Sequence, residues 1–475
     1  MAFLGLRPSR SPAIVDTASG AILTFADVLD RGHDVASRLG ATKQLLFLVA
    51  RNDLFSVVTY AGVVASGHAL ALLDGRSPTA ASADIIGAYR PRWVAGPAGL
   101  ARELGDAGVA IESVDSFAGG ELIRTGLGAV ARVHPETAVL LTTSGTTGSR
   151  KFVRLSASNV EANANSIAQY LELDPGERPV TSLPLHYSFG LSVLNSHWRA
   201  GACVVLTDES VVQPSFWEAF RRNGCTSIAG VPFSYQLLER VGFREMDLPA
   251  LRTMQQAGGA LDRRLTEIYA RFMADRGGRL FVMYGQTEAT ARIAYVPPHR
   301  LAEKLGSAGI AIPGGSLEID PETVELRVGV SVGEVVYRGP NVMMGYASCP
   351  EDLELGDMLG GVLRTGDIGR LDGEGYLFLV GRSKRIAKVF GHRINLDEVE
   401  ARLREHGPAA VVGGQDSIWG FCEFGTEESV AELAASLARD LRLHHTAIRL
   451  RRVDAIPTSA SGKIDYRAVE AWVTG

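Results

Sequence analysis

The sequence predicts an α/β protein: a large N-terminal domain of parallel-rich sheets flanked by helices, with a small β-barrel-like subdomain and a small α+β C-terminal domain. Three observations predict this class. Short apolar runs alternate with amphipathic stretches from about residue 50 to 290, glycine-broken β-like runs follow from about 318 to 379, and the chain after about 383 has its own helices and strands. A length of 475 residues suits a large domain with a smaller one.

The elements of the large domain follow from the period of its apolar residues. Continuous apolar runs predict buried strands at 45–49, 139–143, 180–183, 203–207 and 280–283, and amphipathic runs predict helices at 159–173, 216–223, 234–241 and 262–276. Strands without a polar face indicate parallel sheets that are covered by helices on both sides. In such sheets ligands bind beyond the carboxyl ends of the strands.

The composition excludes several classes of protein. Apolar residues at 46% and charged residues at 21% are typical of a globular domain, and a net charge of −5 gives no reason to expect nucleic acid or an anionic membrane as a partner. The first 25 residues lack the hydrophobic block of a signal peptide, and no run of about 18 apolar residues follows. The four cysteines lie far apart, without metal-like spacing. We therefore expect a cytoplasmic protein.

The segment 140–151 is the strongest functional signal. It holds six hydroxyl residues and two glycines and ends in Lys151, directly after an apolar run. Glycines let the backbone approach a polyphosphate, hydroxyls and amides donate hydrogen bonds, and the lysine adds positive charge. A Walker loop would need a glycine five positions after Gly145, where this chain has Arg150. A flexible surface linker has a similar composition, but the position after a predicted strand favours a phosphate site.

This segment resembles the phosphate loop of the adenylate-forming superfamily, which includes acyl-CoA synthetases, aryl-acid ligases, luciferases and peptide-synthetase adenylation domains. Arg150 and Phe152 stand where that family usually has proline and glycine. The resemblance implies a phosphate-binding role for Thr143, Ser144, Gly145, Thr146, Thr147, Gly148 and Lys151.

A second segment, 280–290, runs from an apolar strand into an aromatic residue, a glycine and polar groups. Tyr284 offers a flat surface to a purine, Thr287 offers a donor, and Glu288 is a hard-oxygen ligand for magnesium. Taken alone, the same residues also suit a strand end followed by helix capping. The segment resembles the family motif Tyr-Gly-x-Thr-Glu, which implies that Tyr284 and Gly285 contact adenine and that Thr287 and Glu288 are catalytic, with Glu288 on the metal.

A third segment joins Asp367 to the basic stretch 381–393. An acidic residue can bind the paired hydroxyls of a ribose, whereas a basic stretch is often only a solvated turn. Together they resemble the family's Thr-Gly-Asp motif and its following Gly-Arg, which implies that Asp367 and Arg382 contact ribose and that Lys384 is a hinge. The expected domains are therefore 1–382, which binds ATP and acid, and 383–475, a mobile lid.

A fourth segment, 456–465, carries Lys463 after a run of small residues. Such a loop lets a lysine reach into another domain's cleft, although by itself it would be a surface turn. It resembles the family's Pro-x-Thr-x-Ser-Gly-Lys motif, with Thr458 one place early. Lys463 is therefore the leading catalytic candidate.

Two weaker resemblances complete the site. The segment 256–261 resembles the family's adenine loop, which implies that Gly258, Gly259 and Ala260 bind adenine, although it is equally a strand-to-helix turn. The segment 183–191 resembles the motif that gates the acid pocket, and a structural role for its histidine remains open. The expected pocket residues are His186, Tyr187, Asn195, Val231 and Phe233.

The residues suit an adenylation reaction. A carboxylic acid is already ionised at neutral pH, so its attack on the α-phosphate needs positioning and charge neutralisation rather than a general base. The resemblance implies ATP and Mg²⁺ as cofactors, a small-molecule acid, and CoA, a carrier protein or an amine as an acceptor supplied in trans. A diazotase that activates nitrite for an aromatic amine remains an alternative, as does an inactive nucleotide-binding regulator.

We expect Lys463→Ala to abolish adenylate formation and to spare transfer from a supplied acyl-adenylate, because one lysine cannot serve both half-reactions. Pyrophosphate release measures the first half-reaction, and AMP release from synthetic adenylate measures the second. An equal loss in both assays would refute the role of Lys463.

Overall fold

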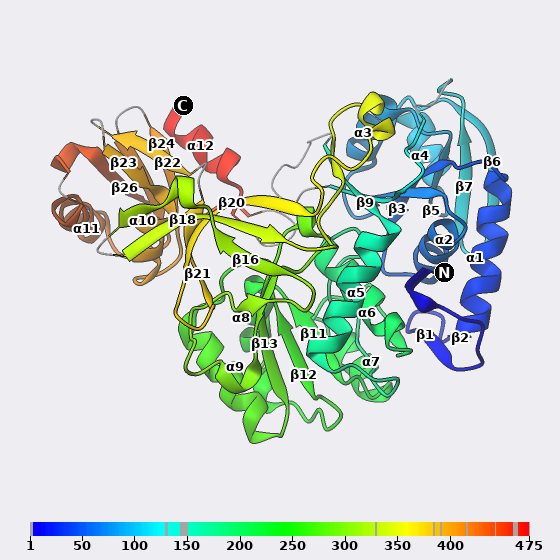
Figure 1. Cartoon of the computed structure of the whole chain (residues 1–475), viewed down its shortest axis with the longest axis horizontal. Helices are drawn as coiled ribbons and strands as arrows, with labels where there is room; N and C mark the ends of the chain where they lie inside the picture. Colours follow the sequence, from blue (N-terminus) through cyan, green and yellow to red (C-terminus); the bar gives the residue numbers. More distant parts are fainter. Residues whose placement is uncertain are drawn as a thin grey trace. The chain divides into compact units, whose positions relative to one another are not determined.

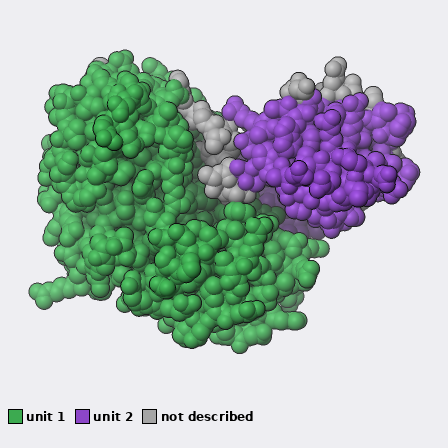
Figure 2. All heavy atoms as spheres, turned by 180° about the vertical axis from the view of Figure 1, so that it is seen from behind, with its two compact units in different colours: residues 1–305, 309–316, 338–363 green, residues 306–308, 317–337, 364–475 purple. Residues whose placement is uncertain are grey.

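The computed structural model describes residues 3–128, 132–142, 151–327, 330–382, 385–389, 392–414, 417–441, 443–458 and 464–474. The chain divides into two compact units, drawn in green and purple in Figure 2. The first comprises residues 1–305, 309–316 and 338–363, and the second comprises residues 306–308, 317–337 and 364–475.

The largest sheet of the first unit has eight strands (Figure 1). Their order is β19 (Gly345–Ala347), β9 (Phe152–Ser156), β8 (Thr137–Thr142), β4 (Ala69–Asp74), β3 (Leu45–Ala50), β5 (Trp93–Pro97), β7 (Gly120–Thr125) and β6 (Ile111–Phe117). Strands β8, β4, β3 and β5 are parallel, and the strands outside them pair antiparallel.

Both faces of this sheet are buried, as the continuous apolar strands predict. Along β3, Leu46 and Leu48 belong to one hydrophobic cluster, whereas Leu45, Phe47 and Val49 belong to another. Successive side chains of a strand point to opposite faces, so each cluster fills one side of the sheet. The expected parallel-rich α/β class is confirmed.

Two further sheets and nine α-helices complete the described part of the first unit. One sheet is β11 (Ser227–Gly230), β12 (Thr253–Gln256), β13 (Arg279–Tyr284), β14 (Ala294–Val296) and β15 (Ile310–Ala311), and the other is β10 (Val204–Leu206), β1 (Pro12–Asp16) and β2 (Ile22–Thr24). The helices are α1 (Phe25–Leu39), α2 (Leu54–Ala65), α3 (Thr79–Tyr89), α4 (Leu100–Asp106), α5 (Ala157–Leu171), α6 (Ser188–Arg199), α7 (Pro214–Arg222), α8 (Pro232–Arg240) and α9 (Arg263–Asp275).

The prediction of a strand at 180–183 is wrong. Residues 179 and 180 form only isolated bridges, to Ser227 and to Val205. Pro179 and Pro184 flank the segment, and a proline cannot donate to a strand ladder. The apolar run therefore links two sheets by single bridges.

The second unit contains a sheet of β16 (Ser316–Ile319), β18 (Val330–Arg338), β20 (Val362–Leu371) and β21 (Leu377–Arg382), with β17 (Glu325–Arg327) on β18. This sheet corresponds to the small β-rich subdomain expected from the sequence. The remaining elements are β22 (Ile386–Val389), β23 (His392–Asn395), α10 (Leu396–Arg404), β24 (Ala409–Gly414), β25 (Ser417–Cys422), α11 (Glu427–Asp440), β26 (Ile448–Arg452) and α12 (Tyr466–Thr474). The predicted domain boundary after residue 382 concerns independent motion and stays a prediction. Among the described residues, no helix has the length and hydropathy needed to cross a membrane.

Strand β19 is held in place by one buried arginine. Arg154 of β9 is fully buried, and its guanidinium donates to the carbonyls of Met344 (3.5 Å), Tyr346 (3.2 Å), Gly356 (3.2 Å) and Leu355. The planar guanidinium has five donors in a fixed fork, so it can satisfy several carbonyls at once. Arg154 therefore fixes β19 and the segment after it.

We expect Arg154→Lys to destabilise the protein by about 3 kcal/mol, because an ammonium cannot reach all four carbonyls and leaves buried acceptors unsatisfied. Thermal melting followed by circular dichroism measures the loss. Arg240→Lys is the matched control, since Arg240 is exposed on α8. Equal melting temperatures for the two variants would contradict the bracing role.

Candidate active site

The predicted phosphate loop begins where strand β8 ends. β8 ends at Thr142 and β9 begins at Phe152, so the loop leaves the carboxyl end of a strand that pairs in parallel with β4. The predicted residues 143–148 lie outside the described residues. Lys151 is described, and it is half-buried directly before β9.

Tyr346 of β19 contacts two of the predicted site residues. The Nζ atom of Lys151 lies 3.3 Å from the centroid of the Tyr346 ring, and the Tyr346 hydroxyl donates to Oε1 of Glu288 at 2.8 Å. Burial, together with the negative charge of Glu288, raises the pKa of Tyr346, so its hydroxyl remains a donor. The predicted phosphate-binding lysine and the predicted metal ligand are thus brought together through a tyrosine.

The motif at 284–288 forms a tightly packed turn. β13 ends at Tyr284, whose hydroxyl accepts a hydrogen bond from Gln286 at 3.3 Å, and a short 3₁₀ helix, η3 (Thr287–Ala289), follows. A Cβ atom added to Gly285 would lie 1.8 Å from the carbonyl oxygen of Ala291, so only glycine fits there. The carbonyl of Glu288 accepts from the amide of Met343 at 2.9 Å.

The turn after Glu288 is strained. Thr290 has φ 64° and ψ −54°, and the amide of Ala291 donates to the carbonyl of Ala289 at 2.7 Å. This is a γ-turn with positive φ, which is rare and costly for a β-branched residue. The Thr290 hydroxyl donates to the carbonyl of Asn341 at 2.7 Å, and this buried hydrogen bond holds the turn.

The acid-pocket motif meets both nucleotide motifs. The hydroxyls of Ser188 and Thr287 lie 3.3 Å apart within hydrogen-bonding range. Gly258 has φ +82°, and a Cβ atom added there would lie 2.5 Å from the Tyr187 hydroxyl and 3.0 Å from a methyl of Val231. The sequence assigns Tyr187 and Val231 to the acid pocket and Gly258 to the adenine loop, and the structure brings the three together. We call these three residues the Tyr187 cluster.

The rest of the predicted adenine loop extends from this point. The side chain of Gln256 donates to the carbonyl of Gly259 at 2.8 Å, and the position of a Cβ on Gly259 would be 3.2 Å from Pro232. Gly259 and Ala260 are exposed. The loop thus presents backbone toward solvent beside the Tyr187 cluster, where a ligand can approach it.

His186 lies beside a carboxylate at the end of β4. Its Nδ1 is 3.6 Å from Oδ1 of Asp74, too far for a hydrogen bond. Burial lowers the pKa of His186, and the opposing effect of Asp74 is smaller. The structure therefore places a partly buried His186 beside a carboxylate, and its role in the acid pocket stays a prediction.

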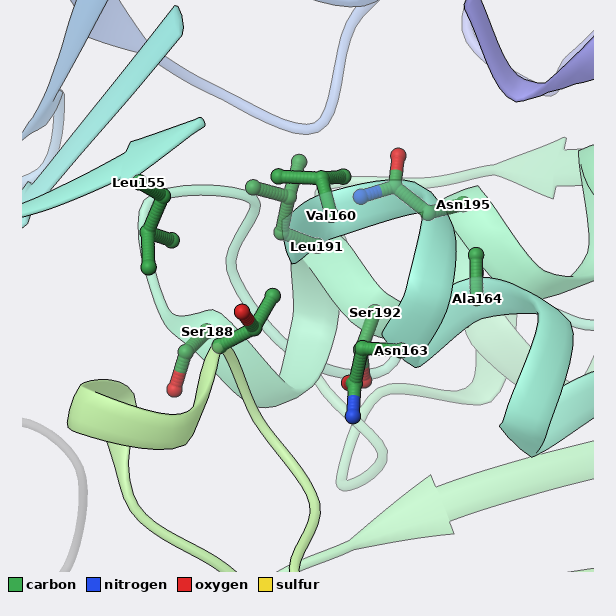
Figure 3. A pocket seen from close by; sticks show the side chains of 9 residues that line it. Leu155, Val160, Asn163, Ala164, Ser188, Leu191, Ser192 and Asn195 are labelled. Carbon is green, nitrogen blue, oxygen red and sulfur yellow. The ribbon is translucent and has the colours of Figure 1, made fainter. Parts of the chain in front are cut away.

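Two other predicted pocket residues occupy different surroundings. Asn195 of α6 accepts a hydrogen bond from the Tyr60 hydroxyl at 2.9 Å and lines a small cavity between α5 and α6, where Figure 3 shows its side chain together with that of Ser188. Phe233 near the start of α8 is 38% exposed. Neither residue has a described hydrogen bond or ring contact with the Tyr187 cluster, so their pocket roles stay predictions.

The second unit brings together the two residues predicted to bind ribose. Asp367 and Arg382 are paired in the β20–β21 register, and Nε of Arg382 donates to Oδ1 of Asp367 at 3.1 Å. The Asp367 carboxylate is buried whereas the guanidinium is largely exposed. The arginine thus orients the carboxylate.

The predicted hinge, Lys384, and the predicted catalytic lysine, Lys463, lie outside the described residues. Next to the hinge, Arg385 pairs with Asp397 (2.5 Å) and Glu400 (3.0 Å), and its guanidinium carbon lies 3.9 Å from the Tyr466 ring centroid. This network holds the residue after the hinge to α10 and α12. Thr458 and Ile464, which flank the second lysine, form an isolated antiparallel bridge.

The residues of the first unit fit a nucleotide with a magnesium ion. Mg²⁺ prefers hard oxygen ligands and is commonly held by one or two carboxylates together with phosphate oxygens. The half-exposed carboxylate of Glu288 and the hydroxyl of Thr287 provide such oxygens, and Lys151 provides positive charge nearby. Sequence reasoning missed Tyr346, Ser188 and Arg154. Ser188 lies within the motif at 183–191 but was assigned no role there, whereas Tyr346 and Arg154 lie in segments without a recognisable motif.

Known proteins are similar to this chain in sequence and in fold. A family model described as AMP-binding enzyme matches residues 5–347. An oxalate–CoA ligase of Arabidopsis thaliana is 31% identical over 71% of this chain and 68% of the relative, and a feruloyl-CoA synthase of an Amycolatopsis species is 29% identical over 74% and 75%. The o-succinylbenzoate CoA synthetase of Bacillus subtilis with its acyl-adenylate superposes with a TM-score of 0.75 at 23% identity, over 99% of this chain and 98% of that one.

The chain therefore belongs to the AMP-binding enzyme family, within the adenylate-forming superfamily that its motifs resemble. It is an ATP-dependent ligase that activates an acid as its adenylate.

We expect Tyr346→Phe to weaken Mg²⁺·ATP binding roughly 10-fold, because it removes a hydrogen bond to the charged Glu288 and keeps the ring beneath Lys151. Tyr346→Leu removes both contacts and is expected to weaken binding further. Calorimetric titration with and without Mg²⁺ measures the effect.

Tyr89→Phe is the matched control for Tyr346→Phe. The Tyr89 hydroxyl donates to the carbonyl of Ala347 at 2.8 Å, so this variant removes a hydroxyl bound to the same strand without touching Lys151 or Glu288. Identical affinities for the two phenylalanine variants would show that Tyr346 does not position these groups.

Proposed function

We propose that this enzyme joins a small-molecule carboxylic acid to coenzyme A in two half-reactions. In the first, a carboxylate oxygen attacks the α-phosphorus of ATP and pyrophosphate leaves. In the second, the sulfur of CoA attacks the acyl carbon of the adenylate, AMP leaves with the bridging oxygen, and the thiol proton passes to solvent.

One observation carries the proposal: the contact of Tyr346 with both Lys151 and Glu288. A positive charge and the carboxylate proposed to bind the metal are thereby linked through one side chain near the end of β8. The hydroxyl contact between Ser188 and Thr287 connects this place to the acid-pocket motif. The residues proposed to bind the triphosphate and those proposed to bind the acid are therefore in contact within one unit.

The chemistry of the first half-reaction follows from charge. Two anions must approach each other, so the site has to neutralise charge and orient the reactants. Lys151 is placed to bind phosphate oxygens, and Lys463 is proposed to neutralise the charge that develops as the adenylate forms. When bound at Glu288, Mg²⁺ supplies further neutralisation of the phosphates.

In the second half-reaction, the CoA thiol must reach the acyl carbon of the adenylate after pyrophosphate has left. We propose that residues 383–475 turn about Lys384 between the two steps, so that Lys463 withdraws. The pair Asp367–Arg382 and the network around Arg385 support this, because they anchor the chain on both sides of the hinge.

The relatives' names support CoA as the acceptor, because each name describes an enzyme that joins an acid to CoA. They do not decide the acid, because oxalate is a dicarboxylate and ferulate is an aromatic monocarboxylate. A carrier protein or an amine as acceptor, and nitrite as the acid, are separate outcomes of the test.

The test is a pyrophosphate-release screen with ATP and Mg²⁺ across aliphatic, aromatic and dicarboxylic acids and nitrite. We expect release with at least one carboxylic acid, and a CoA thioester by mass spectrometry when CoA is added. Lys463→Ala is the negative control for the first step.

Two results would contradict the proposal. Release with nitrite alone, with transfer to an aromatic amine, would make the enzyme a diazotase. A carboxylate adenylate that forms but does not react with CoA would assign the acceptor to a carrier protein or an amine.

A further inference from the structure

Arg292 is a buried cation without a counter-ion. Its side chain is 1% exposed, and one terminal nitrogen, Nη2, has no hydrogen-bond partner. Its Nε faces the sulfur of Met283 at 3.4 Å, and the guanidinium also interacts with the Tyr170 hydroxyl. Within the described ranges no carboxylate pairs with it. Arginine stays charged in proteins, and an unpaired buried charge is strongly unfavourable. Such a residue is explained most directly by an anion that arrives with the ligand.

The guanidinium lies next to the aromatic side chains of the acid-pocket motif. Its central carbon is 3.8 Å from the Phe189 ring centroid, and the Phe189 and Tyr187 rings are 6.3 Å apart. Arg292 also interacts electrostatically with Tyr187, whose hydroxyl lies against Gly258. Arg292 is therefore a near neighbour of the predicted acid-pocket motif, through Phe189 and Tyr187.

The backbone of Arg292 is held firmly, whereas the Nη2 atom of its side chain has no hydrogen-bond partner. Its carbonyl accepts from the side-chain amides of Asn163 at 3.2 Å and Asn341 at 2.9 Å. It also follows the strained turn at Thr290, four residues after Glu288. A backbone fixed in this way keeps the guanidinium at one position, as a recognition group requires.

We propose that Arg292 is the counter-charge for a second anionic group on the acid substrate, so that the preferred substrates carry a carboxylate or sulfonate besides the reacting carboxylate. This inference rests on the proposed function and names the substrate class of the same site. Phe189 covers one face of the guanidinium, and the edge at Nη2 is the part that binds the anion.

The test compares acids matched in size that differ by one charged group: benzoate with isophthalate, propionate with succinate, and acetate with sulfoacetate. For at least one pair we expect the wild-type enzyme to have the higher kcat/KM with the doubly charged acid. Arg292→Met keeps the length of the side chain and removes the charge. It is expected to lose about 30-fold or more in kcat/KM for the doubly charged acid and to change little with the singly charged one.

Arg279→Met is the matched control. Arg279 lies in β13, its guanidinium carbon is 5.4 Å from the Phe281 ring centroid, and its charge is paired with Glu172 at the surface. This variant is expected to leave the preference between the paired acids unchanged. Arg292→Lys restores a positive charge without the planar fork and is expected to recover part of the preference.

Melting temperature separates recognition from a purely structural role. Removing an unpaired buried charge is expected to leave Arg292→Met at least as stable as Arg279→Met, and the doubly charged acid is expected to raise the melting temperature of the wild type but not of Arg292→Met. A clear loss of stability in Arg292→Met, with the acid preference unchanged, would overturn the proposal.

Failure of this inference differs from failure of the proposed function. If the wild type releases pyrophosphate with carboxylic acids and favours the singly charged member of every pair, only the role of Arg292 is refuted. If no carboxylic acid supports release, the proposed function fails, and the melting experiment still decides whether Arg292 binds a doubly charged acid.

Discussion

The active site of the first unit depends on how strand β19 is held against β9. The buried guanidinium of Arg154 binds four carbonyls: one just before β19, one in β19 and two in the segment after it. The register places Tyr346 opposite Val153, two residues beyond Lys151. Tyr346 then contacts the lysine through its ring and Glu288 through its hydroxyl. A buried cation thus helps to set the spacing between Lys151 and Glu288, the charged groups predicted to bind the nucleotide and its metal ion.

Strain in this site is confined to the turn that follows Glu288. Thr290 adopts a positive φ that β-branched residues avoid, and its hydroxyl and the neighbouring Asn341 hold it there. Such strain persists only where surrounding contacts determine the conformation more strongly than local preference does. The turn fixes Glu288 on one side and Arg292 on the other. One distorted peptide segment therefore connects Glu288, the predicted metal ligand, to Arg292, which lies beside Phe189 of the predicted acid-pocket motif.

In the second unit, the predicted hinge lies between two anchored residues. Before it, Arg382 holds the carboxylate of Asp367, and after it Arg385 is bound to two acids and lies over an aromatic ring. Thr458 and Ile464, which lie on either side of Lys463 in the sequence, form a bridge within the same unit. The Arg382 amide also donates to Asp397 at 2.8 Å, so a rotation at this connection would have to break a hydrogen bond that crosses it.

The sequence by itself determined the fold class and the order of the motifs, because apolar periodicity and loop chemistry are local. It also placed Tyr187 and Gly258 in one site through resemblance. It did not reveal Tyr346, Ser188 or Arg154, whose partners lie 58, 99 and about 200 residues away in the chain. Nor did it show that the apolar run at 180–183 forms bridges instead of a strand. Only the tertiary structure decided these points, because each depends on which distant backbone or charge lies within hydrogen-bonding distance.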